Sequence, residues 1–157
     1  MGTEFNEQIG YANFTQDTDS ATTFSATDTF TPLVLSIDDT FATATTISNE
    51  GNKFIANSRG IYLVQKRLSV TGGSNAEYTM EITLNNVALS YTTMSFTTKG
   101  TNIWELQNFA LIDMSTNDID EKGFGTSVNK LGTQVKCTSG TNTLTLKNAS
   151  FVLIRIQ

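Results

Sequence analysis

The stretch that decides the fold runs from Glu77 to Tyr91 and reads EYTMEITLNNVALSY. From Tyr78 to Leu84, apolar residues alternate with polar ones, which is the period-two pattern of an antiparallel strand with one buried face. The Asn-Asn pair at 85 and 86 follows, and because Asn tolerates positive φ it suits the tight turn of a hairpin. Alternation then resumes through Tyr91, so this stretch predicts a β-hairpin with one face against a core.

Similar segments lie on both sides of this hairpin. We expect strands at 33–37, 53–56, 61–70, 103–112, 126–137, 144–146 and 150–156, separated by turn-forming residues. No 12-residue stretch shows helical periodicity. The sequence therefore predicts an all-β antiparallel sandwich of about eight to ten strands.

The composition excludes several kinds of chemistry. The chain has 157 residues, of which 38% are hydrophobic, with ten Phe, no His and one Cys. Without His there is no Ser-His-Asp catalysis and no His-ligated metal, and the lone Cys137 cannot form an intramolecular disulfide. We expect no enzymatic activity, no cofactor and no metal, with Cys137 as a small buried apolar residue.

Acidic residues dominate the first third of the chain. Residues 1–52 carry eight acidic and no basic residues, whereas 53–157 carry seven acidic and ten basic ones, so the charges are −8 and +3. This argues against binding to nucleic acid or to an anionic membrane. Two interpretations stay open: contact with a basic protein surface, on this chain or on a neighbouring subunit, or a solvated segment that maintains solubility. We also expect no secretory signal, and no stretch approaches the ~20 apolar residues of a membrane helix.

Residues 1–50 are predicted to form an acidic, Thr-rich N-terminal arm, with a first strand at 33–37, and residues 51–157 to form the main domain. Residues 2–5 also match what two adjacent cloning sites would encode, so 1–5 can be vector-derived. Single aromatic residues occur at intervals along the arm, and we expect them to anchor it in grooves of another subunit. The alternative is that this segment is a loosely ordered leader. These residues are Tyr11, Phe14, Phe24 and Phe30.

The final strand is apolar on both faces, because Phe151 to Ile154 are all apolar. Such a strand needs cover on each side. We expect the domain core on one side and a second subunit on the other.

Candidate sites have simpler interpretations beside them. The acidic cluster from Asp113 to Glu121 could bind Ca²⁺, but Asp118 and Phe124 replace the Gly and Glu that an EF-hand loop needs, so a polar turn is favoured. Glu77 and Glu81 are expected to face outward on a strand.

Four segments together resemble the jelly-roll domains of tumour necrosis factor and the complement globular head. Residues 60–64, GIYLV, resemble the G-x-Y-x-V strand of that family, and Leu84-Asn-Asn86 stands where the family often has Asn-Gly. Residues 111–119 and 144–156 resemble its later strands, and the similarity covers roughly residues 52–157.

The resemblance implies a homotrimer in which apolar residues of central strands meet at the threefold axis. It points to Tyr62, Phe151 and Leu153 as interface residues. The Thr- and Asn-rich chain and polar N-terminus are most similar to the bacteriophage virion branch of this superfamily. That implies a non-enzymatic structural protein on the outer surface of the virion, either a capsid decoration (cement) protein or a head-fibre protein, anchored to capsid proteins through its N-terminal arm.

Two alternatives remain. The domain can be a receptor-binding knob or carbohydrate-binding adhesin at the tip of a tail fibre, which would add a host-surface glycan to its partners. Loop tips at Gly72-Gly73 and Gly123-Phe124 are candidates for that contact. A carboxylate-dependent glycosidase is the third interpretation.

Overall fold

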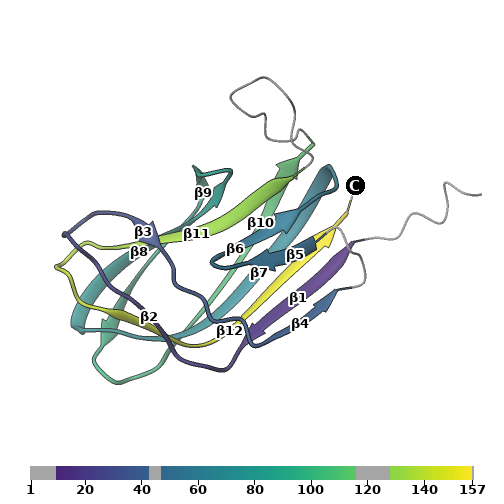
Figure 1. Ribbon diagram of the computed structural model, residues 1–157. Helices are drawn as coiled ribbons and strands as arrows, with labels where there is room; N and C mark the ends of the chain where they lie inside the picture. The colour runs from purple at the N-terminus through teal and green to yellow at the C-terminus, as the bar shows by residue number, and fades with distance from the viewer. Residues whose placement is uncertain (1–9, 43–46, 116–127, 157) are drawn as a thin grey trace, which may run out of the picture.

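The computed structural model describes residues 10–42, 47–115 and 128–156, and these form two antiparallel sheets packed face to face (Figure 1). Sheet A has the order β10 (Trp104–Met114), β7 (Gly60–Thr71), β12 (Leu144–Arg155), β1 (Tyr11–Gln16), β4 (Asp39–Ala42), and β2 (Ser20–Thr22) also pairs with β12. Sheet B has the order β5 (Ile47–Glu50), β6 (Lys53–Ala56), β11 (Asn129–Cys137), β8 (Ser74–Leu84), β9 (Val87–Lys99), and β3 (Thr31–Pro32) pairs with β11. The predicted all-β jelly-roll sandwich is confirmed.

The predicted hairpin is present as β8 and β9. Asn85 and Asn86 have φ angles of 52° and 66°, the left-handed values that this two-residue turn requires. Strand β9 continues beyond Tyr91 to Lys99 after an irregularity in its pairing with β8. There Thr92 Oγ1 accepts a hydrogen bond from the Ile82 amide at 2.8 Å, so a side chain replaces the missing backbone partner.

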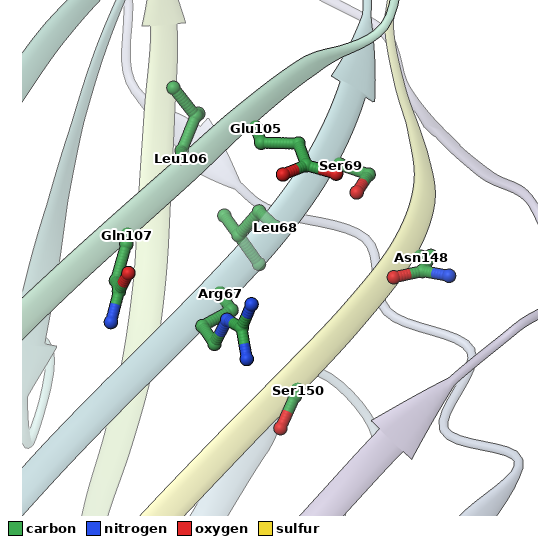
Figure 2. Close-up of a pocket in the computed structure, with 8 residues that line it drawn as sticks. All are labelled: Arg67, Leu68, Ser69, Glu105, Leu106, Gln107, Asn148 and Ser150. Carbon is green, nitrogen blue, oxygen red and sulfur yellow. The ribbon is translucent and has the colours of Figure 1, made fainter.

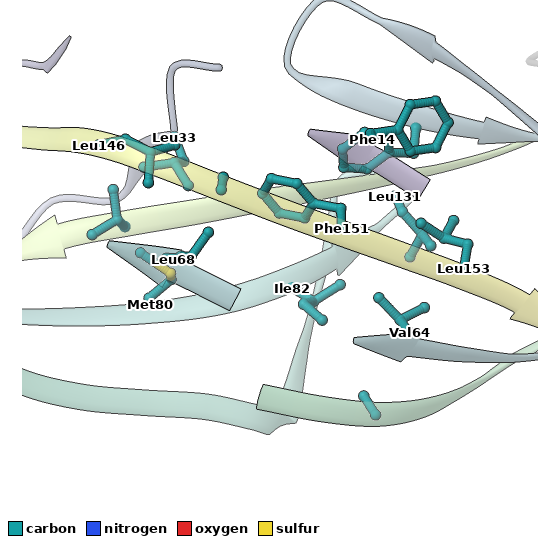
Figure 3. Packing of buried hydrophobic residues seen from close by; sticks show 14 of the residues in the cluster. Phe14, Leu33, Val64, Leu68, Met80, Ile82, Leu131, Leu146, Phe151 and Leu153 are labelled. Atoms are coloured by element: carbon teal, nitrogen blue, oxygen red, sulfur yellow. The ribbon is translucent and has the colours of Figure 1, made fainter. Parts of the chain in front are cut away.

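Aromatic rings join the two sheets at the centre of the core. Phe54 of sheet B contacts Phe14 and Phe151 of sheet A, with ring centroids 4.6 and 4.9 Å apart. Figure 3 shows Phe14 and Phe151 on adjacent strands together with the aliphatic residues around them, including Leu131 and Leu153. All three rings are buried, so their contacts determine how the two sheets pack against each other.

The structure corrects the predicted division of the chain at residue 50. Strand β1 lies inside sheet A, between β12 and β4, with Phe14 opposite Phe151. Phe14 is buried and is therefore part of the main core. The described residues from Tyr11 onward belong to the sandwich, and residues 1–9 lie outside the described ranges.

The segment 33–37 is not a strand. Its backbone is satisfied largely by side chains: the Leu35 amide donates to Asn52 Oδ1 at 2.9 Å, and the Ser36 amide donates to Gln16 Oε1 at 2.7 Å. Leu33 is buried, which explains the apolar run. The chain crosses here from sheet B to sheet A, so its apolar residues reach the core without a strand partner.

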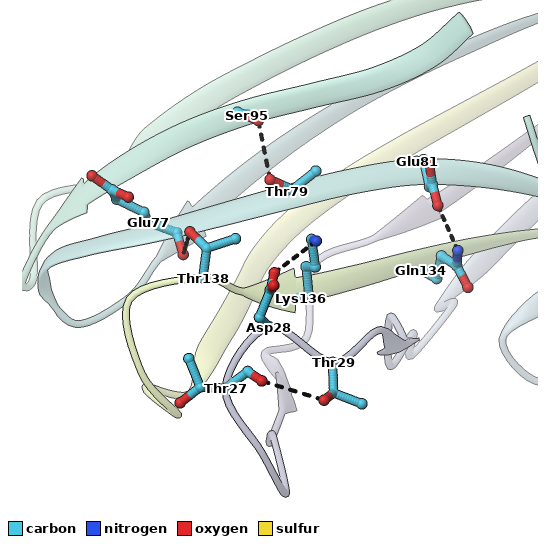
Figure 4. Close-up of polar contacts among 10 residues, drawn as sticks. All are labelled: Thr27, Asp28, Thr29, Glu77, Thr79, Glu81, Ser95, Gln134, Lys136 and Thr138. Carbon is cyan, nitrogen blue, oxygen red and sulfur yellow. Dashed lines mark hydrogen bonds and ion pairs between the residues drawn. The ribbon is translucent and has the colours of Figure 1, made fainter. Parts of the chain in front are cut away.

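Acidic residues of the first third contact the rest of the same chain. Asp28 pairs with Lys136 at 2.7 Å (Figure 4), and Asp19 pairs with Lys147. Asp38 Oδ2 accepts hydrogen bonds from the Asp17 and Thr18 amides, which lower the pKa of this carboxyl. Asp19 and Asp28 therefore contact basic residues of their own chain, which is one of the two basic surfaces considered for the acidic segment.

One lysine is buried in the core. Lys66 of β7 faces the sandwich interior and is 1% exposed, and its Nζ has no hydrogen-bond partner in the described part of the chain. Its flanking residues across the sheet are Asn108 and Phe151. Burial lowers the pKa of this ammonium group to about 8, because the charged form loses its hydration.

The aromatic contact predicts a large effect of truncating its central ring. Phe54→Ala should lower the free energy of unfolding by about 3–5 kcal/mol, since it removes contacts with both sheets and leaves a cavity. Urea denaturation followed by intrinsic fluorescence measures this. The matched control is Ile55→Ala, whose side chain faces outward from the next position. Equal losses for the two variants would contradict the central role of Phe54.

Lys66 predicts an unusual dependence of stability on pH. Its pKa is lower in the folded chain than the ordinary 10.5, so between pH ~8 and ~10.5 the unfolded state binds more protons and the free energy of unfolding rises with pH. Lys66→Met should abolish this rise and increase the free energy of unfolding at pH 7 by about 3 kcal/mol. Urea denaturation at a series of pH values tests this, with exposed Lys99→Met as control. Parallel profiles for wild type and Lys66→Met would refute it.

Candidate functional site on the outer face of sheet A

The three residues predicted at a subunit interface lie inside the chain's own core. Tyr62 and Leu153 are 0% exposed and Phe151 is 2% exposed. Tyr62 Oη donates to the Ser58 carbonyl at 2.8 Å, and burial raises the pKa of its phenol. Sheet B covers all three, so the prediction that they contact a second subunit is wrong for these side chains.

The opposite face of the same strands is the one left uncovered. Side chains alternate along a strand, so the neighbours of Tyr62 and Leu153 point away from sheet B. A first row of directly opposed apolar residues crosses this outer face on β1, β12, β7 and β10: Tyr11, Ile154, Leu63 and Leu111. Leu111 is 58% exposed.

A second row lies beside the first and crosses all five strands. It consists of Phe41, Asn13, Val152, Gln65 and Phe109. Phe41 is 62% exposed and Phe109 is 58% exposed, at the two ends of the row. Asn13 and Gln65 are polar, so this second row is apolar at Phe41, Val152 and Phe109 only. We call the two rows together the apolar rows, and no described residue outside sheet A covers them.

The apolar surface extends around the edge at which the two sheets meet. Tyr91 of β9 is exposed, and its hydroxyl donates to the Leu111 carbonyl of β10 at 3.3 Å. Val87 on the same edge strand is also exposed. A contiguous apolar patch of this kind marks an interaction site more often than a solvated surface.

The outer face of sheet B is polar by contrast. Thr79 and Ser95 hydroxyls lie 3.1 Å apart, and Gln134 Nε2 donates to Glu81 Oε1 at 2.6 Å (Figure 4). Glu77 is exposed on this face, as predicted, whereas Glu81 is only 8% exposed, because Thr93 and Gln134 pack against it and donate hydrogen bonds to its carboxylate. The two outer faces therefore differ in chemistry: hydroxyls and charges on sheet B, apolar rows on sheet A.

A polar groove lies on sheet A next to the apolar rows. Its volume is about 430 Å³, and residues of β7, β10 and β12 line it. Figure 2 shows Arg67 between Gln107 of β10 and Ser150 of β12, with Glu105 beside Ser69. We call this the Arg67 groove.

A β-bulge shapes one wall of the Arg67 groove. The pairing of β12 with β7 shifts between Leu146 and Asn148, so Lys147 is an extra residue in β12. Leu146 stays in the core while Asn148 is exposed on the groove. Bulges re-aim side chains in this way and are common next to functional sites.

The aromatic residues predicted to anchor an arm have separate positions. Phe14 and Phe24 are buried in this chain's core, so they are not available to another subunit, and that part of the prediction is wrong. Phe30 lies under Lys136, with Nζ 4.9 Å from the ring centroid. Tyr11 lies on the outer face of sheet A, 6.1 Å from Phe41 between ring centroids.

Of the acidic cluster, the described part is a local turn. The Ser115 amide donates to Asp113 Oδ1 at 2.9 Å, and hydrogen bonds from Ser115 lower the pKa of this carboxyl. The remainder, through Glu121, lies outside the described residues. Within the described ranges, no three His, Cys, Asp or Glu residues are grouped so that they could hold a metal ion.

The candidate loop tip at Gly72-Gly73 is tightly packed. A β-carbon at Gly72 would lie 2.6 Å from Thr98 Oγ1, and one at Gly73 would lie 2.6 Å from Asn142. These glycines therefore permit close packing, and Gly123-Phe124 lies outside the described ranges. Cys137 is buried, as expected, and the described part of the chain has no helix long and apolar enough to cross a bilayer.

Comparison with protein-family models and with curated proteins gives no match. Among solved structures, murine APRIL at pH 5.0 is similar over 95% of this chain and 100% of its own, with 6% identity and a TM-score of 0.59. PRD1 vertex protein P5 is similar over 94% of this chain and 97% of its own, with 10% identity and a TM-score of 0.57.

The Eiger TNF from S. frugiperda is similar over 95% of this chain and 93% of its own, with 12% identity and a TM-score of 0.54. These identities are low, so the similarity concerns the fold. The chain has the tumour-necrosis-factor-like jelly-roll fold that its sequence resembles.

Proposed function

We propose that this chain is a non-enzymatic structural protein that assembles as a homotrimer through the outer face of sheet A. The observation that carries the proposal is the pair of apolar rows, in which Leu63, Val152 and Ile154 occupy the centre of a face that no other part of residues 10–42, 47–115 and 128–156 covers. Burying such surface stabilises association by roughly 25 cal/mol per Å². Sheet B would then face solvent, which suits its hydroxyl and charged side chains.

A ring of three copies accounts for both the face and the edge. The apolar residues on the β9–β10 edge, such as Tyr91, differ from those at the centre of sheet A. When one patch packs on a different patch of the next copy, the contact is heterologous, and a closed ring satisfies every copy. The fold resemblance favours three copies in that ring.

We further propose a place on the outer surface of a phage virion, as a capsid decoration or head-fibre protein. Support comes from the similarity to PRD1 vertex protein P5, which spans nearly the whole of both chains. Because β1 is a strand of sheet A, we assign anchoring to capsid proteins to the residues that precede it and follow residues 1–5, which can be vector-derived; Glu7 is among the assigned residues. A tail-fibre knob or adhesin is the second candidate, and the Arg67 groove favours it.

The trimer predicts a defined effect of charge on the apolar rows. Wild-type protein should have the mass of three chains by size-exclusion chromatography with light scattering, and Leu63→Glu should yield folded monomer, because a carboxylate buried at the interface would lose its hydration. Thr79→Glu, on the outer face of sheet B, is the matched control and should stay trimeric. A monomeric wild type, or a trimeric Leu63→Glu, would contradict the assignment of the interface.

The virion role predicts that the protein is part of purified particles. Mass spectrometry of gradient-purified virions should detect it, and antibodies against it should label intact particles. Deletion of residues 2–9 should abolish rebinding to stripped particles while the protein remains trimeric. Rebinding by the deleted protein would contradict N-terminal anchoring, and absence from the particles would refute the virion role.

A further inference from the structure

The Arg67 groove contains polar side chains that have no partner among the residues that the structure describes. Five of them make no hydrogen bond or ion pair with any described residue: Arg67, Ser69, Glu105, Gln107 and Asn148. Only Ser150 among the polar lining residues is engaged, since its hydroxyl donates to Asn13 Oδ1 at 3.1 Å. On the outer face of sheet B, in contrast, Thr79, Glu81 and Gln134 bond to one another's strands or to neighbouring strands.

We propose that the Arg67 groove binds a saccharide unit that bears one carboxylate, with Arg67 as the partner of that carboxylate. Arg67 is the one basic residue among those that line the groove, and it is exposed there. A guanidinium binds a carboxylate through two parallel hydrogen bonds, which gives orientation as well as affinity. The neighbouring hydroxyls and amides are suited to the hydroxyl groups of a sugar ring.

The charge of the groove selects among anions. It holds one guanidinium and one carboxylate, Arg67 and Glu105, so it has no net positive charge. A phosphate or a polysulfated chain would be repelled by Glu105 without a second cation to compensate. A ligand with a single negative charge and several hydroxyls fits better, because Glu105 can accept hydrogen bonds from hydroxyl donors while Arg67 binds the acid.

The groove is large enough for a sugar ring. Its volume of about 430 Å³ lies within the range of small-molecule sites, roughly 300–1,000 Å³. The extra residue Lys147 shifts the register of β12 against β7 by one residue. As a result Asn148 faces the groove. Lys147 itself pairs with Asp19, so its charge is already satisfied away from the site.

The groove is also distinct from the proposed subunit interface. Covering Arg67, Glu105 and Gln107 with an apolar surface would remove water from their polar atoms without giving those atoms new hydrogen-bond partners, which is unfavourable. A second copy would therefore be expected to cover the apolar rows and to leave the groove open beside them. The saccharide site does not depend on the trimer, and it can be tested whatever the oligomeric state.

The test is an amide chemical-shift titration of the full chain with three acidic sugars and their neutral counterparts. The acids are glucuronic acid, galacturonic acid and N-acetylneuraminic acid, and the counterparts are glucose, galactose and N-acetylmannosamine; acetate serves as the carboxylate alone. At least one acid should shift amides of β7, β10 and β12. Its neutral counterpart and acetate should each bind at least about tenfold more weakly, because each lacks half of the interactions.

Variants then assign the carboxylate contact to Arg67. Arg67→Gln should weaken binding at least about tenfold, as expected for loss of a charged hydrogen-bonding partner. Arg59→Gln, in the turn between β6 and β7, is the matched control and should bind as wild type. Light scattering on the same samples keeps a change of oligomeric state separate from a change of binding.

Four outcomes would overturn the proposal. They are no shift with any of the three acids, equal binding of an acid and its neutral counterpart, acetate binding as tightly as the sugar acid, and unchanged binding by Arg67→Gln. The third outcome identifies a simple carboxylate site in place of a saccharide site.

Discussion

The rest of the structure depends on the contact of Phe54 with Phe14 and Phe151. Phe54 is the sheet B side of a sandwich whose sheet A side is made by strands from opposite ends of the chain, β1 and β12. With Phe14 opposite Phe151 on those strands, the register of the chain's two ends is tied to the packing of the sheets. The contacts are long-range in sequence, because Phe54 lies 40 positions after Phe14 and 97 positions before Phe151. Everything on the outer face of sheet A follows from it, because the face that β1 and β12 turn inward determines which residues they leave outside.

Alternation revealed strands readily but revealed their faces only where one face was polar. Between Tyr78 and Leu84 the polar residues mark the outside, and the prediction of strand, turn and buried face was correct. In β12 both faces are apolar, so the pattern showed that two covers were needed but could not show which residues meet the core. Phe151 and Leu153, the predicted interface residues, face the core, and Val152 and Ile154 occupy the outer face. Only the register with β1 and β7, which no local pattern contains, settles this.

The N-terminal third illustrates a different limit. Its aromatic residues are single and widely spaced, which favours neither helix nor strand, and its acidic charge is typical of a solvated segment. Phe14 is nevertheless a core residue, because a strand of six residues with alternate burial can join a sheet whose other members supply the apolar contacts. The lack of basic residues before Lys53 has a counterpart within the chain: Asp19 pairs with Lys147 at the edge of sheet A, and Asp28 pairs with Lys136 at the edge of sheet B. Charge segregation along the sequence thus became charge pairing in the fold, although exposed pairs of this kind contribute little to stability.

The Arg67 groove could not be predicted from the sequence, because it too depends on strand register. Arg67, Gln107 and Ser150 lie on three different strands and become neighbours only through the registers of β10, β7 and β12. Each residue alone has the ordinary appearance of a solvated position on a strand. What distinguishes the site is that sheet A places polar side chains, among them Arg67 and Gln107 with no partner among the described residues, directly beside the apolar rows on one face. An apolar surface and a set of unpartnered hydrogen-bonding groups have opposite requirements, exclusion of water for the first and polar contacts for the second. A single face that carries both is therefore best explained by two occupants, a protein surface on the rows and a polar ligand in the groove.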